Sequence, residues 1–83
     1  MVNVMVTRHP RNDVILVDFH DPKTGDPITA IMAAPNRIFL YSEKWDHAEN
    51  EVWVPAKITK DKLGAILMAI SAYVDDDVQM VEK

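Results

Sequence analysis

β-branched apolar residues occupy every second position at the start of the chain. Val2, Val4 and Val6 alternate with Asn3 and Thr7, and a period of two is typical of a strand with one buried face. The same criterion, applied to runs rich in β-branched and aromatic residues, predicts four more strands. The predicted strands span residues 1–7, 14–20, 28–33, 37–42 and 51–58.

The strongest turn signal lies between the second and third of these strands. Pro22 fixes the φ angle that the first corner of a turn needs, and Gly25 tolerates the left-handed conformation that closes it. We therefore predict a β-hairpin loop over residues 21–27. Pro55 cannot donate a hydrogen bond within a sheet, so the strand at 51–58 is expected at an edge or with a bulge.

A helical pattern replaces the alternation near the C-terminus. Thr59 is a suitable N-cap, and Asp61 suits the positive end of the helix dipole. The helix is predicted over residues 60–74, Asp75-Asp76-Asp77 ends it, and residues 78–81 form a short closing strand. The order predicts an α+β fold: an antiparallel sheet of four to six strands, built from hairpins as a meander, with one long helix packed on one face.

The predicted helix has no charged stripe. One face carries the large apolar residues that would pack on the sheet, namely Leu63, Ile66, Leu67, Ile70 and Val74. The opposite face carries Ala65, Met68, Ala69 and Ala72. Three explanations stay open: this face pairs with a second copy of the chain, another segment of the same chain covers it, or its alanines simply tolerate water. We take the homodimer as the leading hypothesis.

Length and composition limit the function classes. The 83 residues fit a single domain, 1–83. No apolar run approaches the roughly 18 residues that a membrane-spanning helix needs, and the N-terminus lacks the features of a secretory signal. Without cysteine, disulfides and thiolate chemistry are excluded. We expect a cytoplasmic protein with no membrane partner.

The sequence offers little chemistry for catalysis. Ser42 and Ser71 lie outside any Gly-x-Ser-x-Gly motif, and two glycines cannot build the usual phosphate-binding loop. The three histidines lie far apart, without the spacing of metal ligands. We predict no cofactor, no metal site and no enzymatic activity. A small metal-dependent or hydrolytic enzyme is the third hypothesis.

Binding is the remaining class, and two kinds of partner stay open. The net charge is −4, and a tryptophan in the longest loop is a typical interface anchor, although it could equally cover the end of the sheet. The residues predicted to bind a protein partner are Trp45, Asp46, Glu49, Asp75, Asp76 and Asp77. Aromatic residues beside basic ones can also bind single-stranded nucleic acid. The residues predicted for that alternative are Arg37, Tyr41, Trp53, Lys57, Lys60 and Lys62.

The sequence therefore favours a small acidic binding or regulatory protein, such as an inhibitor or adaptor, that acts as a homodimer through protein contacts. A single-stranded nucleic-acid-binding protein that uses the face of the sheet is the alternative.

Overall fold

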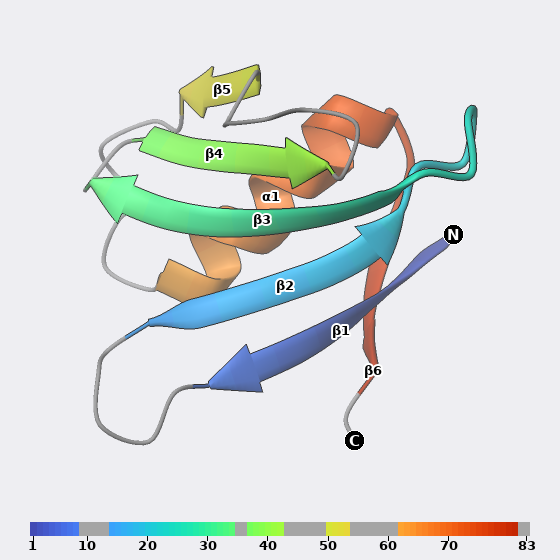
Figure 1. Ribbon diagram of the computed structural model, residues 1–83. Coiled ribbons are helices and arrows are strands. Elements are labelled where there is room, and N and C mark those ends of the chain that lie inside the picture. Colours follow the sequence, from blue (N-terminus) through green and yellow to red (C-terminus); the bar gives the residue numbers. More distant parts are fainter. Residues whose placement is uncertain (9–13, 35–36, 43–49, 54–61, 82–83) are drawn as a thin grey trace.

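The computed structural model describes residues 1–8, 14–34, 37–42, 50–53 and 62–81. Figure 1 shows a twisted sheet with one helix lying against it. The elements are β1 (Val2–Arg8), β2 (Ile15–His20), β3 (Pro27–Ala34), β4 (Arg37–Ser42), β5 (Asn50–Trp53), α1 (Lys62–Val74) and β6 (Val78–Val81).

The six strands form one sheet in the order β5-β4-β3-β2-β1-β6. The first five strands are an antiparallel meander, as predicted, and β5 lies at an edge of the sheet. Pro55, on which the expected edge position rested, lies outside the described residues. The prediction of a wholly antiparallel sheet was wrong, because β6 pairs with β1 in parallel. Two parallel strands need a crossover connection between them, and here α1 brings the chain back to the end of the sheet where β1 begins.

The β2–β3 hairpin loop is confirmed. Gly25 has a φ of 77°, and its N–H donates to the carbonyl of Asp21 at 2.7 Å. The Asp21 side chain accepts a hydrogen bond from the N–H of Lys23 at 2.8 Å. Proline sets the start of this turn and glycine its end, which is why it could be read from the sequence alone.

The helix was expected to be long, over residues 60–74, and this was wrong: it has 13 residues and begins at Lys62. At 1.5 Å per residue it is roughly 20 Å long, enough to cross the sheet once. The predicted N-cap, Thr59, lies outside the described residues. The predicted end of the helix at Val74 is confirmed.

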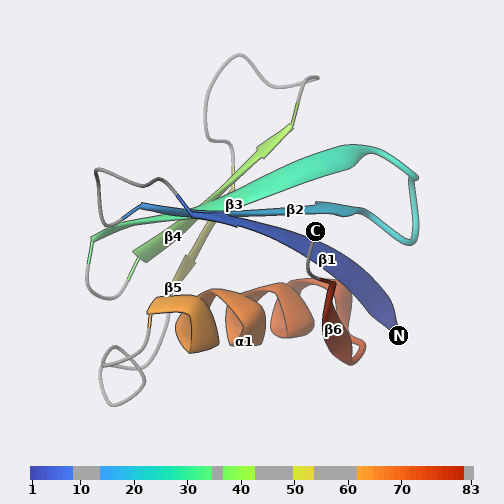
Figure 2. The same ribbon diagram turned by 90° about the horizontal axis from the view of Figure 1, so that it is seen from below.

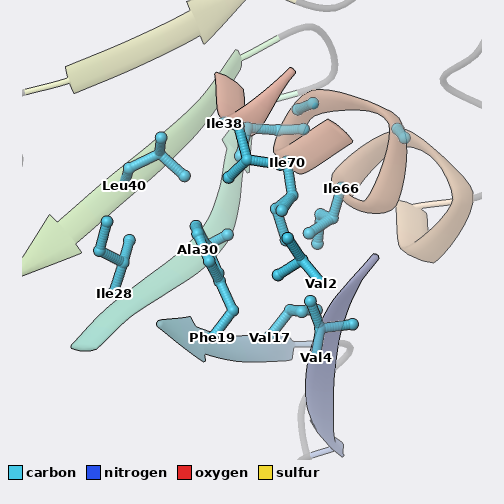
Figure 3. Packing of buried hydrophobic residues seen from close by; sticks show 13 residues of the cluster. Val2, Val4, Val17, Phe19, Ile28, Ala30, Ile38, Leu40, Ile66 and Ile70 are labelled. Carbon is cyan, nitrogen blue, oxygen red and sulfur yellow. The ribbon is translucent and has the colours of Figure 1, made fainter. Parts of the chain in front are cut away.

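The core lies between α1 and one face of the sheet. Every second residue of the central strands points toward the helix, and Figure 3 shows Ile66 and Ile70 of α1 directed at these side chains. The buried apolar residues are Val2, Val4, Val17, Phe19, Ile28, Ala30, Ile38, Leu40, Ala65, Ile66, Ala69, Ile70 and Val74.

The predicted alanine face of the helix is divided in the structure. Ala65 is 0% exposed and Ala69 is 4% exposed, so both lie in the core of this chain and are unavailable to a second copy. Met68 is 55% exposed, and Ala72 is also exposed. The prediction that all four residues share an outer face was therefore wrong. The buried stripe of the helix thus includes two small residues beside Ile66, Ile70 and Val74.

The end of the helix is a Schellman-type turn. Asp75 has a φ of 55°, and the N–H of Asp76 donates to the carbonyl of Ser71 at 3.3 Å. A left-handed residue followed by this bond is the usual way in which a helix stops. The N–H of Val2 then donates to the carbonyl of Asp77 at 2.8 Å, which joins the turn to β1.

Candidate binding face of the sheet

The two faces of the sheet have different surroundings. Figure 2 shows α1 on one side only. Among the described elements, the helix contacts β2, β3, β5 and β6, and none covers the opposite side of the sheet. We call that opposite side the open face.

Strand register places five side chains of the open face in one row. Val81 pairs with Met5, Met5 with Asp18, Asp18 with Thr29, and Thr29 with Tyr41. The row therefore crosses five strands, from β6 to β4. Paired residues on one face lie about 5 Å apart, so these side chains form a continuous strip although they are far apart in the sequence.

This strip lines a groove with a volume of about 850 Å³. The apolar side chains that reach solvent in it are those of Met5, Pro27, Tyr41 and Val81, whereas Val4, Phe19 and Ile28 border it with their side chains buried in the core. The lining residues are Asn3, Val4, Met5, Asp18, Phe19, His20, Pro27, Ile28, Thr29, Tyr41, Ser42 and Val81. A concave, mostly apolar surface with a small number of polar groups is the usual form of a ligand site.

Asp18 is the acidic residue of the groove. Its carboxylate accepts a hydrogen bond from the hydroxyl of Thr29 at 2.5 Å. Because the two residues are direct partners across β2 and β3, the sheet itself fixes this contact. The pair thus presents an oriented, exposed carboxylate in the middle of the strip.

An aromatic and cationic strip runs along β4, beside the groove. The guanidinium of Arg37 lies 5.5 Å from the centroid of the Phe39 ring. The rings of Phe39 and Tyr41 are 6.5 Å apart between centroids, at an angle of 43°. These three residues alternate along the strand and so share the open face.

The residues predicted for nucleic-acid binding are not all brought together. Arg37 and Tyr41 share the open face, but Lys62 begins the helix, which lies on the other side of the sheet. Trp53 pairs with Arg37 through the backbone of β5. Lys57 and Lys60 lie outside the described residues.

The residues predicted to bind a protein fall into two groups. Trp45, Asp46 and Glu49 lie outside the described part of the chain. Asp75 and its two neighbours form the turn after the helix, away from the groove. They border a second hollow of about 530 Å³ with Met68, Ser71 and Ala72.

Asp76 takes part in the contacts that hold this turn. Its carboxylate lies 3.0 Å from the N-terminal ammonium of Met1 and accepts a bond from the N–H of Asp77 at 2.7 Å. The bond from the ammonium, then that from Asp77, lowers the pKa of the Asp76 carboxyl. Within the described ranges, no group of three or more metal-ligating side chains gathers at this turn or elsewhere.

Sequence reasoning missed most of the groove. Asp18, Thr29 and Met5 were not selected, because each is an ordinary outward-facing residue of a strand. The available signal was polar residues alternating with buried ones in neighbouring strands, but the register that aligns them depends on the whole sheet.

No family model, curated protein or solved structure matches this chain. Among the described residues, no helix is long and apolar enough to span a membrane.

Proposed function

We propose that this is a non-enzymatic binding protein whose partner is another protein and whose binding surface is the open face of the sheet. The observation that carries the proposal is the groove of about 850 Å³ on the face that α1 leaves uncovered. Its exposed apolar side chains offer surface that a partner would remove from water, and its polar groups can form hydrogen bonds that orient the partner.

The polar groups of the groove support binding rather than catalysis. Asp18 and His20 are its titratable groups apart from Tyr41, and the hydrogen bond that the structure gives Asp18 comes from Thr29. Covalent catalysis needs a nucleophile held against a base that a third group orients, and the described residues of the groove give no such arrangement.

The open face differs from two of the surfaces that the sequence predicted for protein contacts, the acidic residues after the helix and one face of the helix. The acidic turn holds the end of the helix, and half of the predicted dimer face lies in the core. The homodimer stays a prediction, now restricted to the exposed part of the helix around Met68 and Ala72. The role of the loop that contains Trp45 also stays a prediction.

Single-stranded nucleic acid is the second candidate, and the strip of Arg37, Phe39 and Tyr41 favours it. Bases stack on such rings, and an arginine can follow the phosphates. Two facts favour a protein partner instead: the net charge is −4, and Asp18 occupies the middle of the neighbouring groove. Both oppose the approach of a phosphate backbone.

A random peptide-display library, panned against the immobilised protein, tests the proposal. We expect enriched peptides to bind the wild type and to lose about tenfold or more in affinity for Tyr41→Ala, because a hot-spot aromatic typically contributes 2 kcal/mol or more. Tyr41 is 41% exposed, so this substitution should lower the melting temperature by only a few degrees.

Trp45→Ala tests the other residue predicted to anchor a partner, and a short oligothymidine at two salt concentrations tests the second candidate. Peptides that bind Tyr41→Ala as well as wild type, or that lose affinity only for Trp45→Ala, would contradict the open face as the binding surface. Oligothymidine binding that weakens with salt and is lost in Tyr41→Ala would select the nucleic-acid candidate.

A further inference from the structure

The groove on the open face contains a carboxylate, that of Asp18, for which the described residues provide no opposite charge within ion-pair distance. Thr29 donates a hydrogen bond to Asp18 but carries no charge, so it does not neutralise the carboxylate. Within the ranges that the structure describes, Asp18 forms no ion pair with a lysine or arginine. Arg37, on the same face, is directed at the Phe39 ring instead.

The side chains around Asp18 suit a ligand that is cationic at its tip and apolar along its stem. Met5 and Val81 continue the row on one side of Asp18, and Tyr41 ends it on the other. Asp18 and Tyr41 flank Thr29 from two strands that lie roughly 10 Å apart, twice the spacing of neighbouring strands. A planar cation seated over Thr29 would therefore meet a carboxylate on one edge and an aromatic ring on the other.

Resting on the proposed function, we propose that the groove recognises a cationic side chain, arginine first and lysine second, of the partner protein. A guanidinium can donate two parallel hydrogen bonds to a carboxylate and can also stack on an aromatic ring. An acidic or phosphorylated segment would place like charge against Asp18. A purely apolar segment would bury this carboxylate without a partner, which is costly.

Four pools of pentapeptides, identical except for a central Arg, Lys, Leu or Glu, test this inference by fluorescence titration. The expected order of affinity is Arg, Lys, Leu, Glu. Asp18→Asn keeps an oxygen that can accept from Thr29 but removes the charge, so it should weaken the Arg pool about tenfold, as the loss of a charged hydrogen bond does. The Leu pool should change less than twofold. Tyr41→Leu should weaken the Arg pool roughly two- to fivefold.

Asp77→Asn is the charge-matched control, because Asp77 is exposed and lies in the turn after the helix. Equal weakening by Asp18→Asn and Asp77→Asn would indicate net charge rather than a site and would overturn the inference. The inference would also be overturned if the wild type bound the Arg and Leu pools equally, bound no pool, or bound oligothymidine more tightly than the Arg pool. If the display-selected peptides still lose affinity for Tyr41→Ala while the protein binds the Arg pool no better than the other pools, the inference fails and the proposed function stands.

Discussion

The two faces of the sheet come from the same strands but carry different side chains. In β4, Ile38 and Leu40 are fully buried under the helix, whereas Tyr41 is 41% exposed on the other side. In β2, Val17 is buried next to the exposed Asp18. The covered face is apolar apart from the buried Ser42, whereas the open face mixes apolar, aromatic and charged groups.

This contrast also explains how so small a chain remains folded. With only 83 residues, the protein buries a limited fraction of its surface and has a small margin of stability. Among the described elements, α1 packs on one face of the sheet and none packs on the other. Substitutions on the covered side should change stability, while those on the open side should change binding.

The largest expected effect comes from placing a charge on the covered side of the helix. Ala69 is 4% exposed in the core, so Ala69→Glu would bury an unpaired carboxylate. Such a charge costs about 3–5 kcal/mol, a large part of the stability of a small domain. We expect most of this variant to be unfolded at room temperature, as measured by circular dichroism.

Ala72→Glu is the matched control, one turn away on the exposed side of the same helix. Its free energy of unfolding should stay within about 0.5 kcal/mol of the wild-type value, as is usual for surface substitutions. Sedimentation of this variant then tests the predicted homodimer: a change from dimer to monomer would confirm pairing through Met68 and Ala72. An equal loss of stability in both variants would contradict the burial of Ala69 within one chain.

A smaller effect separates the two faces within one strand. Leu40→Ala removes a fully buried side chain and should lower the free energy of unfolding by about 3 kcal/mol. Tyr41→Ala, at the next residue but on the open face, should lower it by less than 1 kcal/mol. Urea denaturation of both variants measures the difference, and a larger loss in Tyr41→Ala would reverse the assignment of the faces.

Local signals made part of this architecture predictable. Alternation identified the strands, proline and glycine identified the β2–β3 loop, and three aspartates identified the end of the helix. Each of these features depends on neighbours within a few residues, so the sequence contains the information directly.

Features that depend on distant parts of the chain could not be predicted. The direction of β6 follows from the path of α1 across the sheet. The burial of Ala65 and Ala69 depends on how the helix is turned toward the strands. The groove needs the register of five strands at once, because Asp18 and Tyr41 become neighbours of Thr29 only when β2, β3 and β4 are aligned.

The smallest predicted effect concerns the turn that holds the helix over the covered face. Asp75 adopts a φ of 55°, a left-handed conformation that glycine adopts without the steric cost of a side chain. Its carboxylate also lies at the negative end of the helix dipole, which is unfavourable. Asp75→Gly should therefore raise the free energy of unfolding by about 0.5–1 kcal/mol, as measured by thermal and urea denaturation. Asp77→Gly is the control: it removes the same charge without relieving a left-handed residue, so it should bring no comparable gain. An equal gain in both variants would assign the effect to charge, whereas a loss in Asp75→Gly would contradict the turn described here.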